Sequence, residues 1–404
     1  MLRNHSLHLG LNVLLLGALA GCGVNDGQLD QKEKVRSRSS ALAVERATLD
    51  VNGDGYPDLA IGGQGSAIDV FYGGPSGLPA APSIQLNAPS GIFRNLATAG
   101  DVNGDGYGDL VASTLAQTTG KVLVYLGGPQ GLGSAPSQTI IEPAPAEEFG
   151  FALAGGVDLQ GDGYDDVVVS AIGYNGQRGR VLVYSGSAQG LGTAPVKTLS
   201  AGNEANSHFG YALDVGDLNG DTYPEVVISE NRVGVTPSVG RVYIYWGSAS
   251  AFVSNPPFPF IRPPKVLTCP AGSHQGFGVS VAIIGDANGD GIGDLAVGSY
   301  HVNQNDGRVY LYRGGPSLTG SLGLTPKTFS PAAGTQGYFG WAVRGGDIDG
   351  DGRADLLVGE PDANGMRGRA HVYSRLGSWF SLHGVLSGTH TGAGYLGTAI
   401  ATAD

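Results

Sequence analysis

The sequence is poor in several residue types, and each shortage narrows the class of protein. Cys22 and Cys269 are the only 2 cysteines among 404 residues, so a disulfide-stapled fold is excluded. Charged residues make up 14%, and Asp and Glu outnumber Lys and Arg by 35 to 23, which leaves a formal net charge of −12 at pH 7. A nucleic-acid partner requires a basic face, and this composition argues against one.

Familiar catalytic motifs are also missing. The chain has no Gly-x-Ser-x-Gly elbow, no His-Glu-x-x-His zinc motif and no phosphate-binding P-loop. Its 8 histidines are scattered without ligand spacing. We therefore assign no catalytic residue and expect a protein that is not an enzyme.

Glycine, in contrast, is abundant. It accounts for 70 of 404 residues, far above the usual share of about 7%. Because these glycines follow no collagen period and form no low-complexity blocks, they indicate many tight turns that join many short strands. The length suits one large all-β domain or two ordinary ones.

The first 46 residues predict targeting rather than a folded domain. Residues 1–21 place Arg3 before an apolar stretch that is too short to span a bilayer, as in a lipoprotein signal peptide. The stretch ends in Leu19-Ala20-Gly21-Cys22, which resembles a bacterial lipobox and predicts lipidation at Cys22. Residues 22–46 are polar and predict a flexible tether. We expect a protein of the bacterial cell envelope, lipid-anchored to the membrane, on the periplasmic or cell-surface side of the outer membrane.

A nine-residue acidic stretch is the main repeated feature, and its fullest form runs from Asp347 to Asp355. Carboxylates occupy positions 1, 3, 5 and 9, with glycine at position 6. Such a cluster repels itself unless a hard cation lies within it, and oxygen ligands suit Ca²⁺. No glutamate stands at position 12 and an apolar β-rich run follows, so the loops are not EF-hands. Five related stretches begin at Asp50, Asp101, Asp158, Asp217 and Asp286.

Side chains 1, 3, 5 and 9, with the main-chain carbonyl of residue 7, are the predicted ligands of about five or six Ca²⁺ per chain. Four carboxylates should make the sixth loop the tightest site, whereas Gln160 weakens the third, and Thr222 with Glu225 weakens the fourth. In chain order, the ligands are Asp50, Asn52, Asp54, Tyr56, Asp58; Asp101, Asn103, Asp105, Tyr107, Asp109; Asp158, Gln160, Asp162, Tyr164, Asp166; Asp217, Asn219, Asp221, Tyr223, Glu225; Asp286, Asn288, Asp290, Ile292, Asp294; and Asp347, Asp349, Asp351, Arg353, Asp355.

The acidic loops recur at intervals of 51 to 69 residues, and each interval holds four strand-like segments. The first opens with Phe-Gly, as at Phe149-Gly150, and runs to the acidic loop. The second is the apolar run after that loop, the third begins with glycine and a basic residue, as at Gly179-Arg180, and the fourth is short, as in Gln138–Ile141. Four antiparallel strands per unit form one blade, so residues 47–404 predict an all-β propeller.

The Phe-Gly openings, the Asp-x-Asn-x-Asp-Gly-x-x-Asp loops and the Gly-Arg-Val-Tyr strands resemble the FG-GAP repeats of the integrin α-subunit head and of many bacterial envelope proteins. The resemblance covers about residues 41–404. It implies an integrin α-like β-propeller of four-stranded antiparallel blades, here with six complete repeats plus the first strand of a seventh, because residues 395–404 align with residues 338–347. That last strand either begins an incomplete seventh blade or closes a ring of six. The resemblance also implies ligand recognition on the face away from the Ca²⁺ loops.

These features favour a calcium-binding, lipid-anchored envelope protein whose propeller is a non-enzymatic binding or adhesion module. A protein or a glycan would bind the face opposite the calcium loops, and the membrane would be contacted through the lipid at Cys22. Two alternatives stay open. One is a propeller hydrolase or lyase acting on a glycan or lipid, with Glu230, Glu360 and Asp362 near strand ends as its acids. The other is a structural spacer in a surface assembly.

Overall fold

The structure is a computed structural model. It describes residues 49–62, 66–89, 91–116, 119–141, 148–201, 205–231, 240–248, 251–252, 263–270, 276–315, 326–376, 379–388 and 396–398. The expected signal peptide, the lipidated cysteine and the tether lie outside these ranges. Within the described ranges, no helix is long and apolar enough to cross a membrane.

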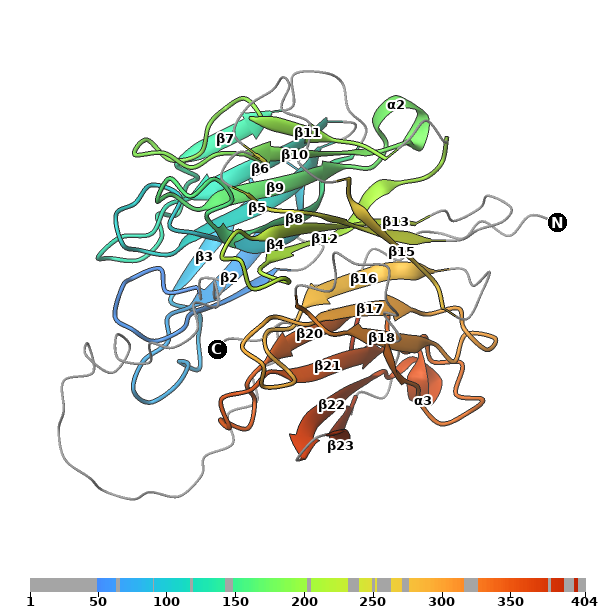
Figure 1. Ribbon diagram of the computed structural model, residues 1–404. Helices are drawn as coiled ribbons and strands as arrows, with labels where there is room; N and C mark the ends of the chain where they lie inside the picture. Colours follow the sequence, from blue (N-terminus) through green and yellow to red (C-terminus); the bar gives the residue numbers. More distant parts are fainter. Residues whose placement is uncertain are drawn as a thin grey trace.

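The chain folds into six antiparallel sheets that follow one another in sequence order (Figure 1). Five have four strands, and the first has three in the part that the structure describes; residues 41–48 lie outside that part. The sheets consist of β1 (Leu59–Gly62), β2 (Ala67–Phe71), β3 (Ile84–Asn87); β4 (Ile92–Gly100), β5 (Asp109–Ala116), β6 (Thr119–Tyr125), β7 (Gln138–Ile141); β8 (Phe149–Val157), β9 (Asp166–Ala171), β10 (Arg180–Tyr184), β11 (Lys197–Leu199); β12 (Phe209–Gly216), β13 (Glu225–Glu230), β14 (Arg241–Tyr245), β15 (Lys265–Thr268); β16 (Phe277–Ile283), β17 (Leu295–Ser299), β18 (Arg308–Tyr312), β19 (Lys327–Phe329); and β20 (Val343–Gly346), β21 (Asp355–Glu360), β22 (Arg369–Leu376), β23 (Trp379–Ser387).

The predicted propeller of four-stranded blades is confirmed by this arrangement. Within a blade, each strand pairs with the next along the chain, and the first strands β4, β8, β12, β16 and β20 of consecutive blades lie side by side. The hydrophobic core lies between blades: one cluster joins Val168 of β9 to Val226 of β13, and another joins Ala296 of β17 to Val358 of β21. The second strands β9 and β13 are therefore buried at every position, since a neighbouring sheet covers each face, and β21 of the last described sheet is buried throughout as well.

The Phe-Gly pairs form the junctions between blades. The ring of Phe209 is fully buried, and its backbone N–H donates to the carbonyl of Arg178 in the preceding blade at 3.0 Å. Gly150 has a φ of 79°, and a Cβ added there would lie 2.5 Å from the Cβ of Ser113. Because only glycine combines that backbone conformation with such a close approach, the Phe-Gly sequence fixes how each of blades three to six sits on the blade before it.

The seventh repeat begins as the sequence predicted. Leu396 forms a parallel bridge with Gly368, just as Phe339 does with Gly307 one blade earlier. One boundary was predicted wrongly: the first strand of the sixth blade starts at Val343 rather than at Phe339, which forms only an isolated bridge. The residues between them make a turn, since Trp341 donates to the carbonyl of Tyr338 at 3.1 Å.

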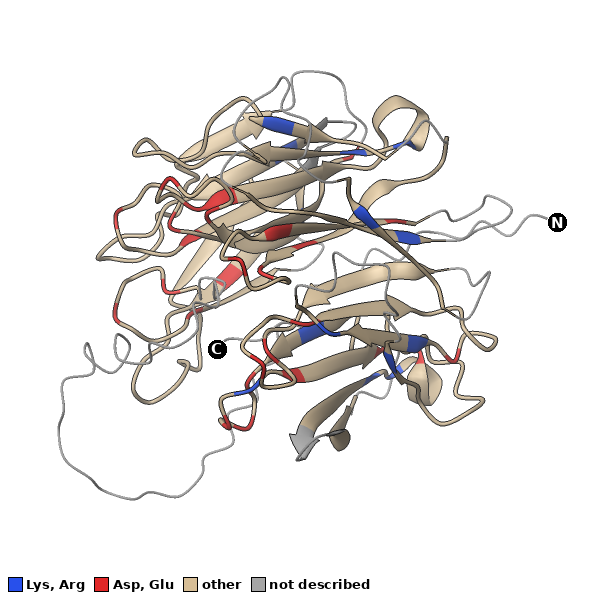
Figure 2. Ribbon diagram, viewed as in Figure 1, with Lys and Arg blue, Asp and Glu red and all other residues tan. Residues whose placement is uncertain are grey.

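The two ends of the strands form two different faces. The acidic loops join first to second strands and gather along the left side of Figure 2. The four-residue elements α2 (Tyr174–Gln177) and α3 (Ala363–Met366) lie in second-to-third-strand connections at the opposite side (Figure 1). Both contain residues with positive φ and are tight loops rather than regular helices. The structure thus separates the acidic face from the varied loops, as predicted.

Candidate metal centres

The first acidic residue of each loop holds the loop together through its carboxylate. In Asp50, Oδ1 accepts hydrogen bonds from the N–H groups of Gly53 and Asp54 at 2.8 and 3.2 Å, and Oδ2 accepts one from Gly55 at 2.9 Å. The bond from position 6 to Oδ2 of position 1 recurs in every loop, at lengths of 2.7 to 3.2 Å. The six loops therefore share one conformation, including the fourth, where Thr222 adopts a φ of 71° in place of glycine.

Positions 3 and 5 lie on the outer side of the loop. The side chain of Asn52 accepts from the N–H of Asp54 at 3.1 Å, and Asp54 accepts from the N–H of Tyr56 at 2.9 Å. These are Asx turns, which also occur without a metal. The side chain at position 5 is exposed in all six loops, so one carboxylate of each loop faces water.

Position 9, in contrast, is buried in all six loops. Asp109 accepts from the N–H of Val102 at 2.9 Å and from that of Gly127 at 2.8 Å, so it connects its own loop to the turn between the third and fourth strands. Burial raises the pKa of Asp109 to about 7, and the neighbouring Asp105 and Asp101 add to the rise. The same cause raises the pKa of Asp58 to about 6, of Asp166 to about 7, of Glu225 to about 8 and of Asp294 to about 6.

Neighbouring loops are also bonded to each other. The N–H of Gly108 in the second loop donates to the carbonyl of Asp50 in the first at 2.7 Å, and Asp165 donates to the carbonyl of Asp101 at 3.1 Å. The carboxylate of Asp165 in turn accepts from the N–H of Asp101 at 2.9 Å. Sequence analysis missed Asp165. The available signal was a carboxylate at position 8, where the other loops have Pro57, Gly108, Pro224, Gly293 and Ala354.

The side chain at position 3 distinguishes the loops. In the first two loops its amide donates to position 5, as Asn52 does to Asp54 at 3.1 Å. In the fourth loop, Asn219 instead donates to Glu225 at 2.8 Å, and Asn288 donates to Asp294 in the fifth at 3.1 Å. An amide can thus offset the buried negative charge at position 9 by hydrogen bonding.

The sixth loop has an aspartate at position 3, which cannot donate when ionised. Asp347, Asp349 and Asp355 place carboxylate oxygens within 4.8 Å of one another, the one such grouping of three among the residues that the structure describes. Hard oxygen donors this close suit a cation such as Ca²⁺. This donor set fits the metal that the sequence predicts, and it belongs to the loop with the most carboxylates.

The sixth loop also differs from the other five in the burial of its second residue. The residue at position 2 is fully buried in the first five loops, as with Val51 and Leu218, where the next blade packs over it. Ile348, at the same position of the sixth loop, is 38% exposed. Within the described ranges, therefore, no following blade covers this loop as one covers each of the others.

Two of the three acids named for the enzyme alternative, Glu230 and Glu360, are buried within their blades. Glu230 accepts a hydrogen bond from the hydroxyl of Tyr243 at 2.5 Å, and Glu360 lies 2.8 Å from Nε2 of His371. The two glutamates are 1% and 0% exposed. Asp362 immediately precedes α3. Each glutamate is thus held by the third strand of its own blade instead of facing a shared cleft.

Known proteins resemble this chain in sequence. A family model described as an FG-GAP-like repeat matches residues 50–112, 158–228 and 286–358, which together make up just over half of the chain. The chain is 33% identical to Integrin alpha-PS5 of Drosophila melanogaster over 171 residues, which cover 41% of this chain and 16% of that protein. It is 30% identical to Integrin alpha ina-1 of Caenorhabditis elegans over 220 residues, covering 50% and 19%.

Human Integrin alpha-IIb is 38% identical over 160 residues, which cover 34% of this chain and 15% of that protein. The matched region thus spans less than a fifth of each of these three relatives. Among solved structures, one described as "Structure of Dos1 propeller" aligns with a TM-score of 0.45 and 16% identity, covering 83% of this chain and 68% of that one.

Proposed function

The chain belongs to the FG-GAP-like repeat family, and from this premise we propose that it is a calcium-stabilised, non-enzymatic module for binding or adhesion. The observation that carries the proposal is one acidic loop repeated six times in the same conformation on one face. The opposite face carries loops of varied sequence. Variable loops on a rigid scaffold suit recognition.

In each loop, the side chains at positions 1, 3, 5 and 9 would hold the cation together with the carbonyl of residue 7. Bound Ca²⁺ would supply the positive charge that these clustered carboxylates lack. The chain prepares the site by burying position 9 and by fixing position 1 with backbone N–H groups, as Asp109 and Asp50 illustrate. Because the loops are bonded to each other, filling one loop should also stabilise its neighbours.

The non-enzymatic part of the proposal is supported by the surroundings of the candidate acids. Glu230 and Glu360 are buried within their blades and are 1% and 0% exposed, so neither carboxylate lies on an accessible surface. Glycoside hydrolysis needs two carboxylates about 5–10 Å apart across an accessible cleft. We therefore favour binding over hydrolysis or elimination.

The partner and the location are also part of the proposal. The names of the matched relatives describe integrin α chains, and by analogy a protein or glycan would bind the face opposite the acidic loops. Lipidation at Cys22 would hold the module on a bacterial envelope. A Cys22→Ser variant of the full chain, expressed in a bacterial host with labelled palmitate, should lose both the label and its membrane association. Retention of the label by the variant would exclude this anchor.

The central test is thermal unfolding of residues 41–404 with Ca²⁺ and with a chelator, alongside a count of bound calcium. Each site filled at one hundred times its Kd contributes about 2.7 kcal/mol, so five or six sites should raise the melting temperature by many degrees. Mg²⁺ at the same concentration is the control, because its demand for regular octahedral geometry should make it the poorer ligand. One ion or none, with an unchanged melting temperature, would refute the calcium part of the proposal.

A further inference from the structure

A repeated turn opens blades three to six on the face away from the acidic loops. Its middle pair is Phe-Gly, and in three of the four turns the N–H of the last residue donates to the carbonyl of the first at 3.1 or 3.2 Å. The phenylalanine is buried every time. The residues on either side of Phe-Gly differ between blades: Glu148 and Phe151, His208 and Tyr211, Gly276 and Val279, and Tyr338 and Trp341.

The residue before Phe-Gly has a left-handed backbone in all four turns. Gly276 accepts this conformation freely at a φ of 84°, but Glu148, His208 and Tyr338 adopt it at 70°, 49° and 59°. A non-glycine residue in this region costs on the order of 1–2 kcal/mol, and strain of this kind gathers at ligand-binding sites. Glycine at these positions would remove the strain. The presence of Glu148, His208 and Tyr338 therefore indicates that their side chains serve a purpose other than forming the turn.

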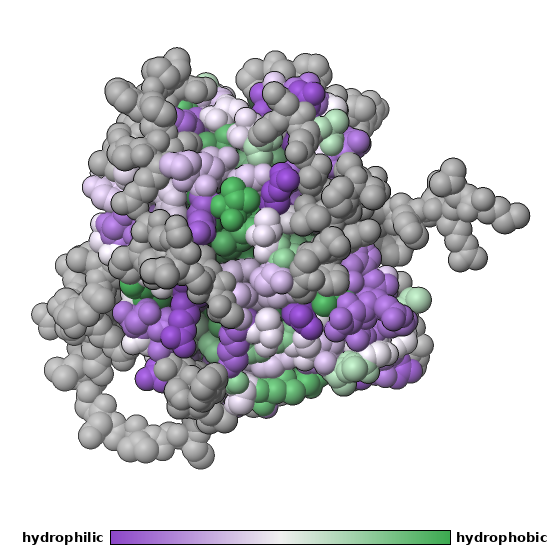
Figure 3. All heavy atoms as spheres, turned by 45° about the vertical axis from the view of Figure 1, so that its right-hand side comes forward, coloured by the Kyte–Doolittle hydropathy of each residue, from purple (hydrophilic) through white to green (hydrophobic). Residues whose placement is uncertain are grey.

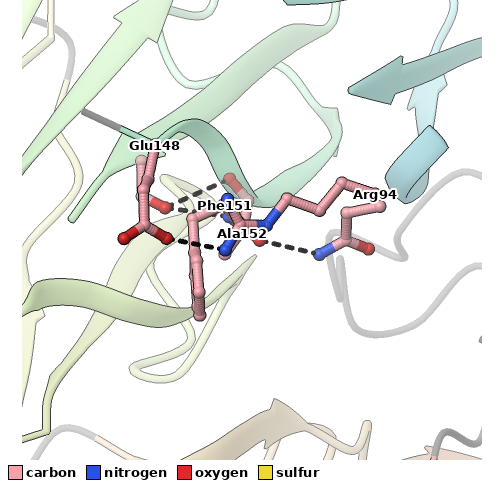
Figure 4. Close-up of polar contacts among 6 residues, drawn as sticks. Arg94, Glu148, Phe151 and Ala152 are labelled. Carbon is pink, nitrogen blue, oxygen red and sulfur yellow. Dashed lines mark hydrogen bonds and ion pairs between the residues drawn. The ribbon is translucent and has the colours of Figure 1, made fainter. Parts of the chain in front are cut away.

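In the third blade, the displayed side chains contact an arginine from the second. The guanidinium of Arg94 in β4 lies 4.4 Å from the ring centroid of Phe151, and its Nη2 donates to Glu148 at 2.7 Å (Figure 4). The Arg94 side chain is only 7% exposed, yet its Nη1 has no hydrogen-bond partner among the residues that the structure describes. Glu148 is 40% exposed. The ion pair thus carries no net charge. Nη1 of Arg94 remains a buried donor, and the carboxylate of Glu148 remains an accessible acceptor.

Aromatic rings extend from this pair across the neighbouring blades. Phe151 lies 5.1 Å from Tyr211 between ring centroids, and Tyr300 lies 5.1 Å from Trp341 and 5.7 Å from Tyr338. Both groups stand at or beside the turns that open blades three to six, and the first strands β8, β12, β16 and β20 that follow these turns lie side by side from blade to blade. We name this set the aromatic rim; it comprises Phe151, Tyr211, Tyr300, His301, Tyr338 and Trp341.

Most rings of the rim are only partly buried. The ring centroid of His301 lies 4.0 Å from that of Tyr300 at an interplanar angle of 40°, and its Nδ1 lies 2.5 Å from Oδ1 of Asn305, so polar groups border the rings. Figure 3 turns the side that carries α2 and α3 forward and shows hydrophobic and hydrophilic residues interspersed over it. Aromatic faces with a few fixed polar groups are typical of small-ligand sites.

We propose that the aromatic rim binds a neutral saccharide, which deepens and rests on the proposed binding function. The apolar C–H faces of a sugar ring can lie flat on Trp341 and Tyr338, as other apolar groups do on aromatic rings. Its hydroxyl groups both donate and accept, so a sugar can donate a hydrogen bond to the accessible carboxylate of Glu148. Arg94 and Glu148 lie in direct contact, so a cationic ligand near Glu148 would also be repelled by Arg94, and an anionic ligand near Arg94 would be repelled by Glu148. This arrangement favours a neutral ligand.

The test is a titration of Ca²⁺-loaded residues 41–404 with uncharged β-linked trisaccharides, namely cellotriose, chitotriose and laminaritriose, followed by tryptophan fluorescence and calorimetry. Saturable binding of at least one trisaccharide is expected. Trp341→Val, which installs the residue that blade five has at the same position, should weaken that binding at least tenfold. Leu382→Ser, on the outer strand β23, is the matched control and should bind as the unchanged protein does.

Tyr338→Gly separates binding from folding. It installs the glycine that blade five carries before Phe-Gly, and so removes backbone strain without blocking the turn. The variant should stay folded and lose affinity for the trisaccharide. The inference is overturned if none of the three trisaccharides saturates, or if binding survives both Trp341→Val and Tyr338→Gly. Neither result would change the calcium count or the calcium-dependent melting, so the proposed function would be judged separately.

Discussion

The carboxylate of Asp165 accepts a hydrogen bond of 2.9 Å from the backbone N–H of Asp101, so the third acidic loop holds the first ligand residue of the second. The backbone of Asp165 completes the connection by donating to the carbonyl of Asp101 at 3.1 Å. Neighbouring acidic loops are therefore coupled through direct bonds. Cation binding in one blade should be sensitive to the blade beside it.

Asp165→Ala should lower the free energy of unfolding by about 1–2 kcal/mol, because it leaves a partly buried N–H without its acceptor. It should also weaken Ca²⁺ binding at the second loop, whose first ligand is Asp101. Urea unfolding and calcium titration measure the two effects. Asp165→Asn is the control, since its side-chain oxygen can still accept the bond. Equal losses in both variants would show that the charge, rather than the hydrogen bond, connects the loops.

The metal-free protein should lose stability as pH rises. Burial raises the folded-state pKa of Asp58 and Asp294 to about 6, of Asp109 and Asp166 to about 7 and of Glu225 to about 8, whereas the unfolded values lie near 4. The folded state thus holds these protons more tightly. Their contribution to stability is complete below about pH 4 and is lost as pH rises through about 8.

Melting in a chelator between pH 5 and 8.5 measures this effect. The melting temperature should fall across the range, while saturating Ca²⁺ should reverse the trend, since the cation binds the deprotonated carboxylates. A melting temperature that rises with pH in the chelator would contradict the conclusion that burial raises the pKa of the carboxylates at position 9.

Gly150→Ala should destabilise the protein much more than Gly77→Ala. Both glycines have a φ near 80°, but an added Cβ lies 2.5 Å from Ser113 at Gly150 and meets nothing within 4 Å at Gly77. Backbone strain alone costs about 1 kcal/mol, and overpacking adds about 1–3 kcal/mol. Urea unfolding of the two variants isolates the steric part. Similar losses would mean that the Phe-Gly junction does not fix the packing of the blades.

Asp351→Ala should weaken Ca²⁺ binding at the sixth loop without unfolding the propeller. Its side chain is exposed and accepts only the N–H of Arg353 at 3.0 Å among the described residues, so the metal-free fold barely depends on it. Removing one of four carboxylates should lower affinity at least about tenfold. Asp221→Ala in the fourth loop should reduce the total Ca²⁺ binding of the chain less than Asp351→Ala does, because the fourth loop is expected to be the weakest site.

Calcium titration by calorimetry, with melting as the check on folding, compares the two variants. Asp69→Ala removes a carboxylate that lies outside the acidic loops and bonds Gln85 on the surface, so it serves as the control. A loss of cooperative melting in metal-free Asp351→Ala would contradict the expectation that the fold barely depends on this side chain.

The sequence by itself determined the repeat, the four strands of each blade and the acidic loops. These features depend on contacts a few residues apart, such as the bonds from Gly55 and Asp54 to Asp50, so a short stretch of chain contains the information. The Phe-Gly pair also marked each junction, because its close backbone approach leaves little choice of residue.

Only the tertiary structure decided which carboxylates are buried, that Asp165 connects two loops, and that side chains from several blades gather in the aromatic rim. Arg94 and Phe151 lie 57 positions apart in sequence, and Tyr211 and Tyr300 are farther apart still. No local pattern relates such positions, since their distances depend on how one sheet packs on the next. Burial, pKa shifts and the grouping of side chains at the rim follow from that packing.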